Sequence, residues 1–193
     1  MFFSRRSVLH FACSMEQQPS HPDAWLAIRR PLLVAFVFGC AVSLMTSGRL
    51  SLRLVAPATL YWTFVPLLEI AGLAAVWPWK RSPVSFARAI DLFFVGNTPW
   101  SLWLCAFAAA WAFFPPARVY AWTGNFWPWY APALAVALWS ACLDFRFFRD
   151  IPGRTPARAC RDLALQRFIA WTGGIVWFMG PPAWQVFASR FRL

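Results

Sequence analysis

The chain has few of the residues that enzymes most often use for catalysis or metal binding. It contains seven acidic residues and two histidines among 193 residues, and both histidines, His10 and His21, precede the first apolar segment. Zinc-protease, phosphate-loop, glycine-rich nucleotide and G-x-S-x-G motifs are missing from the sequence. These absences exclude a P-loop enzyme and a metalloenzyme, and they count against a histidine-ligated haem. We therefore assign no catalytic residue, no metal and no cofactor.

The five cysteines form no metal or redox motif. No two of them are spaced as C-x-x-C, which leaves no support for a zinc or redox site. Three lie inside apolar segments, where cysteine packs as a small hydrophobic residue. We expect free thiols at all five positions, which are Cys13, Cys40, Cys105, Cys142 and Cys160.

Charged residues are too scarce to cover a water-soluble domain. They make up 13% of the chain, against 60% hydrophobic residues, whereas about a quarter of a soluble domain is charged. The formal net charge of +11 does not indicate nucleic acid, because the basic residues stand at the ends of apolar segments. Arginines at such positions anchor helices to the anionic bilayer surface. We expect membrane lipids as partners, and no nucleic acid.

Five apolar segments are long enough to cross a bilayer as helices. A helix rises 1.5 Å per residue, so about 20 residues cross the hydrocarbon core. Runs such as 106–114 do not alternate between apolar and polar residues, as the strands of a membrane barrel would. The sequence predicts an all-α, polytopic transmembrane bundle with spans at about 31–48, 56–77, 98–114, 128–148 and 165–187.

A short helix is predicted ahead of the third span. Ser82 and Pro83 have the pattern of an N-cap followed by proline at the first helical position. Apolar residues then recur on one face, which favours a helix near 83–95 lying in the membrane interface. The alternative is one long kinked span over 84–114.

The fifth span is predicted to start early and to be broken. Thr155 and Pro156 begin a helix that runs into it. Gly173 with Gly174, and Pro181 with Pro182, are expected to interrupt it.

The chain divides into a polar tail, 1–28, and a single transmembrane domain, 29–193. The two arginines near the start resemble a twin-arginine export signal, but the apolar stretch 8–12 is shorter than the core of a signal peptide. We expect a cytoplasmic tail. The sequence leaves open whether translation starts at Met1 or Met15.

Lysine and arginine are unevenly divided between the two ends of the predicted spans. With five spans, thirteen of the 18 fall on the side of the N-terminal tail and five on the other. Cytoplasmic segments carry such an excess. The sequence therefore predicts a cytoplasmic N-terminus and an outside C-terminus, in a bacterial-type inner (plasma) membrane.

Glu69 is the one acidic residue near the middle of a predicted span. A charge at bilayer depth costs about 2.5–3.5 kcal/mol on insertion scales, so Glu69 must be protonated or bonded to a neighbouring helix or partner. Pro66 cannot donate a backbone hydrogen bond, which frees a carbonyl one turn earlier. Glu69 is therefore the intramembrane candidate, as a proton or cation site, a contact to a partner subunit, or a structural bond between helices.

A second set of charged residues is predicted at the cytoplasmic surface, where Asn97 also falls. These residues either form ion pairs among themselves that anchor the helices, or hold lipid phosphates, or dock a protein. The candidates are Arg88, Asp91, Asp144, Arg146 and Arg149, with Asp150 beside them.

Three functions are compatible with the sequence. The favoured one is a non-catalytic accessory, assembly or scaffold subunit of an inner-membrane complex, which packs against other membrane subunits or further copies of itself. The second is a small transporter or channel component that uses Glu69, although the spans hold few polar residues to line a path. The third is a lipid-modifying enzyme at the cytoplasmic face, using Asp91 or Asp144 with the neighbouring arginines.

Overall fold

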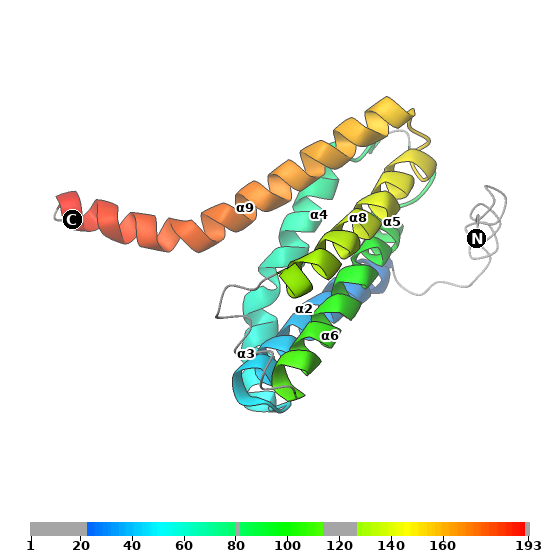
Figure 1. The fold of residues 1–193 in the computed structure, drawn as a ribbon. Coiled ribbons are helices and arrows are strands. Elements are labelled where there is room, and N and C mark those ends of the chain that lie inside the picture. Colours follow the sequence, from blue (N-terminus) through cyan, green and yellow to red (C-terminus); the bar gives the residue numbers. More distant parts are fainter. Residues whose placement is uncertain (1–22, 80–81, 114–126, 192–193) are drawn as a thin grey trace.

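The computed structural model describes residues 23–79, 82–113 and 127–191, and the regular structure in these ranges is all helical (Figure 1). The elements are α2 (Asp23–Ser47), α3 (Leu52–Trp62), α4 (Phe64–Val76), α5 (Phe86–Phe93), a 3-10 turn η1 (Phe94–Asn97), α6 (Thr98–Phe113), α8 (Trp127–Asp150) and α9 (Pro156–Phe191). This confirms the all-α prediction.

Four or five helical stretches are long and apolar enough to cross a membrane. Four meet the requirement by length and composition, namely Ala24–Ser47, Leu52–Val76, Phe86–Phe113 and Ala131–Asp150. The fifth candidate is α9, which has 36 residues. The chain is thus built as a multi-pass membrane protein.

The first helix begins earlier than the sequence suggested. Helix α2 starts at Asp23 and includes Pro31, so the predicted tail, 1–28, overlaps its first turns, and residues 1–22 lie outside the described residues. Pro31 removes one backbone hydrogen bond from α2. The turn before Pro31 is nevertheless stabilised by ion pairs, since Arg29 and Arg30 both bind Asp91 of α5.

Helices α2 and α3 form a close antiparallel pair. Gly48 ends α2 with a φ of 69°, a left-handed conformation that glycine adopts without steric cost. The Ser43 hydroxyl donates to the carbonyl of Arg49 and accepts from the amide of Ser51. Gly39 lies against the backbone of Val55, where a Cβ would overlap it, so this pair can approach only because the residue is glycine.

The predicted second span, 56–77, is broken into two helices. Helix α3 ends at Trp62 and α4 begins at Phe64, with Thr63 between them. Pro66 cannot donate to the carbonyl of Trp62, and its ring crowds the preceding turn, which is the usual cause of a kink. At the break, the Thr63 hydroxyl donates a hydrogen bond to the carbonyl of Leu60.

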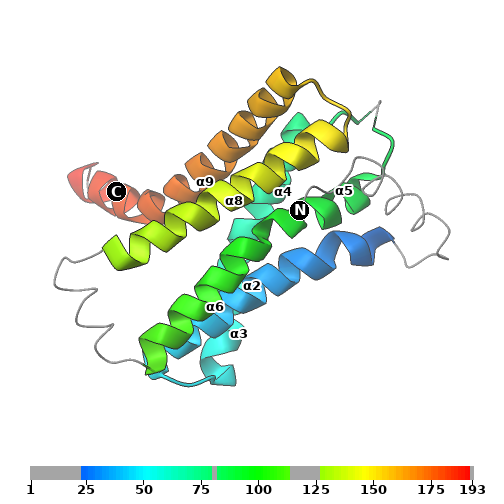
Figure 2. The same cartoon turned by 45° about the vertical axis from the view of Figure 1, so that its right-hand side comes forward.

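The short helix before the third span is present, but its start was predicted wrongly. Helix α5 begins at Phe86, and its N-cap is Ser85, whose side chain accepts from the amide of Arg88. The predicted cap, Ser82, bonds to Val84 instead. One 3-10 turn joins α5 to α6, so the two make one bent helical run, as in the alternative prediction (Figure 2).

The last helix is longer and more continuous than predicted. Helix α9 starts at Pro156, as expected, but continues through both the glycine pair and the proline pair without a break in helical structure. Its first half packs against α4 and α8. Trp177 and Phe178 still contact Phe64, and toward its C-terminal end α9 bends and leads away from the bundle (Figure 1).

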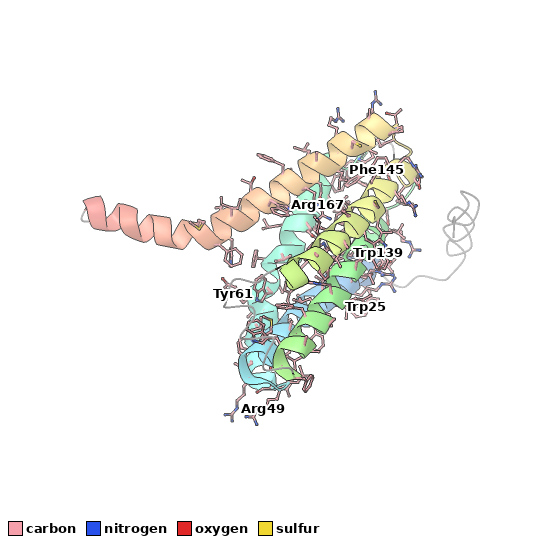
Figure 3. The ribbon with its side chains drawn as sticks, in the orientation of Figure 1. Trp25, Arg49, Tyr61, Trp139, Phe145 and Arg167 are labelled. Carbon is pink, nitrogen blue, oxygen red and sulfur yellow. The ribbon has the colours of Figure 1, made fainter. Side chains whose placement is uncertain are left out.

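The arginines concentrate at one end of the bundle, which we call the arginine-rich end. It is formed by the start of α2, the end of α4, α5, the end of α8 and the start of α9 (Figures 1 and 2). An aromatic core that includes Trp77, Phe93 and Phe148 lies between these elements. Arg49, in the turn between α2 and α3, lies at the opposite end (Figure 3). Among the described residues, the arginines are therefore unevenly divided between the two ends of the bundle.

Candidate functional site

Glu69 is bonded to two other parts of the bundle. The carboxylate lies on α4, seven residues before its end, which is about 10 Å along the helix axis. The side-chain amide of Asn97 donates to Glu69 Oε2 at 2.6 Å. Arg167 Nη1 of α9 lies 3.4 Å from Glu69 Oε1. The expected bond to a neighbouring helix is therefore present.

Asp144 of α8 shares the same arginine. It is buried, and its Oδ2 accepts a hydrogen bond from Arg167 Nη2. Figure 3 shows Arg167 where α9 faces α4 and α8. Beside it, the Ser140 hydroxyl donates to the carbonyl of Gly96 at 2.8 Å. A Cβ on Gly96 would overlap Asp144 Oδ1. The carboxylate can therefore lie at this position only because residue 96 has no side chain.

We call Glu69, Asn97, Asp144 and Arg167 the central cluster. Its four side chains come from α4, η1, α8 and α9, so one guanidinium and one amide connect four elements of the bundle. Removing one partner of a buried ion pair typically costs about 3–5 kcal/mol, because it leaves the other charge uncompensated. The arrangement therefore fixes which helices are neighbours.

A polar side chain continues the cluster along the contact between α9 and α4. Gln166 is fully buried, and no hydrogen bond reaches its side-chain oxygen or nitrogen from the described part of the chain. Its backbone carbonyl lies against Gly72, where a Cβ would be 2.8 Å away. One turn earlier, Asp162 is buried beside Arg154 and Arg161. The side of α9 that faces α4 is thus polar over about two turns.

Asp91 is the centre of a second cluster, which we call the Asp91 cluster. Arg29 binds both of its oxygens, at 2.7 and 2.8 Å, and Arg30 Nε donates to Oδ1 at 2.8 Å. Arg88 Nη1 lies 3.7 Å from Oδ2. The cluster joins the start of α2 to α5. Three guanidiniums surround one carboxylate, so its formal charge is positive.

The predicted interfacial set does not form a single group. Asp144 lies in the central cluster, away from its sequence neighbours, so its predicted pairing within that set is wrong. Within the set, Arg149 binds Asp150 at 2.8 Å, and Arg88 lies 3.7 Å from Asp91. Arg146 is exposed. Arg88 and Asp91 belong to the Asp91 cluster.

Sequence reasoning missed Arg167, which was counted among the loop arginines. The sequence does indicate that Arg167 is unusual, because this arginine lies inside the apolar segment 163–180. An arginine at that position needs a carboxylate partner, and Glu69 is the carboxylate near the middle of a span. Arg29 and Arg30 were likewise counted only among the basic residues at the ends of apolar segments. The structure shows that both form ion pairs with Asp91.

Neither cluster has the composition of a metal centre. In the ranges that the structure covers, no three His, Cys, Asp or Glu side chains gather to hold an ion. Cys40, Cys105, Cys142 and Cys160 are free thiols, as expected, and Cys13 lies outside the described residues. The charged groups of both clusters are instead bound to one another.

The fold and the central cluster define a class: a multi-pass α-helical membrane protein whose buried charges join its own helices. Comparisons of the chain with protein-family models, with curated proteins and with solved structures gave no match. Its function must therefore be argued from its own geometry.

Proposed function

We propose that the protein is a non-catalytic accessory, assembly or scaffold subunit that works by packing against other subunits of an inner (plasma) membrane complex. The observation that carries the proposal is the central cluster. Arg167 is bound to two carboxylates, and Asn97 to one of them. Because these groups hold α4, η1, α8 and α9 together, they serve the bundle rather than a substrate.

The part of α9 from Phe168 to Met179 supplies a surface for a partner. Large apolar side chains follow one another along one side of the helix at spacings of three and four residues, which places them on one stripe. We call them the α9 stripe, and they are Phe168, Trp171, Ile175 and Met179, each exposed. These side chains are on the exposed side of α9, so a second protein can reach them.

The contact surface of α9 is tested by photo-crosslinking in membranes. A photoreactive amino acid at Ile175 is compared with the same residue at Leu138 of α8, since both positions are 61% exposed. We expect a discrete protein adduct from position 175 and none from position 138. Its mass and peptides identify either another subunit or a second copy. Lipid adducts alone at both positions would contradict the proposal.

We further propose five spans, with the N-terminus in the cytoplasm and the C-terminus outside. The support is the concentration of arginines at one end of the bundle, since cytoplasmic ends carry the basic excess. Arg49 and Arg53 are at the other end, in and after the turn that joins α2 to α3.

One observation favours a second function, a transporter or channel component. The central cluster holds two carboxyl groups against one guanidinium, so it has capacity for one further positive charge, such as a proton or cation. If this function is correct, Glu69→Gln abolishes ion-dependent flux in proteoliposomes and leaves the α9 adduct unchanged. The third possibility, a lipid-modifying enzyme, loses support because Asp91 and Asp144 are both buried and engaged by arginines.

A further inference from the structure

We propose that a groove between α2 and α6 binds an acyl chain of an anionic phospholipid, with the lipid phosphate at Arg29 and Arg30. This inference is independent of the proposed subunit role. The groove is lined by residues of α2, η1 and α6, and none of them belongs to the central cluster or to α9.

The groove begins at the Asp91 cluster and runs toward the middle of the bundle. Arg30 lies at the head of the groove. The groove has a volume of about 240 Å³. Its walls are mainly apolar, with Leu33 and Val37 from α2 and Leu102 from α6, and Cys105 lies deepest along α6. Leu33 and Leu102 are about 60% exposed, so the groove opens sideways, where the bilayer would be.

The head of the groove has the charge that a phosphate requires. The guanidiniums of Arg29 and Arg30 both bind the single carboxylate of Asp91, which leaves a positive excess. A guanidinium has five N–H donors in a planar fork that matches phosphate oxygens. Arg30 uses its Nε for Asp91, and its side chain is 38% exposed. An anion can therefore bind here without breaking the contact to Asp91.

The occupant that fits both features is a phospholipid. A soluble anion would use the arginines but not the apolar groove, and a neutral lipid would use the groove but not the charge. An anionic lipid places phosphate at the bilayer surface and acyl chain below it. The groove has the same order, with arginine at the arginine-rich end and apolar residues toward the centre.

Native mass spectrometry of the detergent-solubilised protein tests the site. Phosphatidylglycerol and phosphatidylcholine with identical acyl chains are titrated separately, and the ratio of their dissociation constants is measured. We expect tighter binding of phosphatidylglycerol. Removing one arginine should reduce this preference about fivefold, the equivalent of about 1 kcal/mol per basic residue at a membrane surface. Equal binding of the two lipids overturns the proposal.

Two pairs of variants separate the head of the groove from its walls. Arg30→Gln should reduce the preference about fivefold, whereas Arg49→Gln, the same change at the other end, should leave it unchanged. Cys105→Trp fills the groove and should weaken phosphatidylglycerol binding, whereas Cys142→Trp on exposed α8 surface should not. Arg30→Gln leaves Asp91 bound to Arg29, and the melting temperature of each variant reports folding. Phosphatidylglycerol binding that survives Cys105→Trp at unchanged affinity would show that the groove holds no chain.

Discussion

At the scale of single residues, Arg167 is the side chain that binds two of the buried carboxylates. It faces two carboxylates that lie on different helices, Glu69 on α4 and Asp144 on α8. Without it, both carboxylates would lie in a low-dielectric interior without a cation, whereas the loss of either carboxylate leaves Arg167 one partner. The three residues are therefore unequal in what their removal costs.

Arg167→Gln should lower the free energy of unfolding by about 3–5 kcal/mol. Arg158→Gln is the matched control, because Arg158 is an exposed arginine on the same helix, and surface substitutions usually change stability by less than about 0.5 kcal/mol. Thermal unfolding in detergent measures both. Equal melting temperatures for the two variants would mean that the central cluster does not hold the bundle together.

Gly96→Ala should destabilise the protein through a single added methyl group. Its Cβ would overlap the Asp144 carboxylate, which must then move away from Arg167. Gly174→Ala is the control, since nothing lies within 4 Å of a Cβ there, and alanine in a helix interior is about 0.8–1.0 kcal/mol more favourable than glycine. Opposite shifts in melting temperature are expected, and a shift of the same sign would contradict the close contact.

At the scale of whole elements, the kink between α3 and α4 is the clearest effect of one residue on helix direction. Pro66 removes the bond to the carbonyl of Trp62, and the change of direction brings Tyr61 and Phe64 against Trp177 of α9, with ring centroids 6.1 and 5.0 Å away. The kink therefore extends the contact between α9 and the bundle beyond Arg167 to Trp177.

Pro66→Ala should straighten α3 and α4 into one helix. Spin labels at positions 54 and 71, both exposed, should then move apart, because a straight helix separates its ends more than a bent one. Pro57→Ala is the control, since Pro57 lies within α3 without breaking it. Pulsed electron paramagnetic resonance gives the distance. An unchanged distance in the Pro66 variant would show that tertiary packing, not proline, sets the kink.

Capping residues and the lengths of apolar segments predicted most helix boundaries. The ion pairs between residues far apart in the sequence could not be predicted. The bounds of α6 and α8 agree with the predicted spans to within about two residues, and Thr155 with Pro156 correctly indicated the start of α9. The partner of Asp144 could not be predicted in this way, because it depends on which helices become neighbours. Sequence proximity suggested Arg146 and Arg149, but α9 brings Arg167 to it instead.

At the scale of the whole molecule, the five crossings that we propose require the central cluster. Four helical stretches are apolar enough to cross alone, but α9 carries Arg167 within its apolar part. A buried arginine costs about 2.5–3.5 kcal/mol on insertion scales. Glu69 and Asp144 offset that cost only if α9 packs against α4 and α8. Topology and ion pairing are therefore coupled.

This coupling is tested with a reporter fused after Leu193. Alkaline phosphatase, which is active only outside the cytoplasm, should be active in the wild type, because five crossings place the two termini on opposite sides. Replacing both carboxylates, as Glu69→Leu with Asp144→Leu, leaves Arg167 without a counterion, so a fraction of the chains should fail to insert α9 and lose reporter activity. The further change Arg167→Leu should restore activity, since the central cluster then holds no unpaired charge. An inactive wild-type fusion would mean that α9 does not cross, and a double variant as active as the wild type would mean that α9 inserts without help from the cluster.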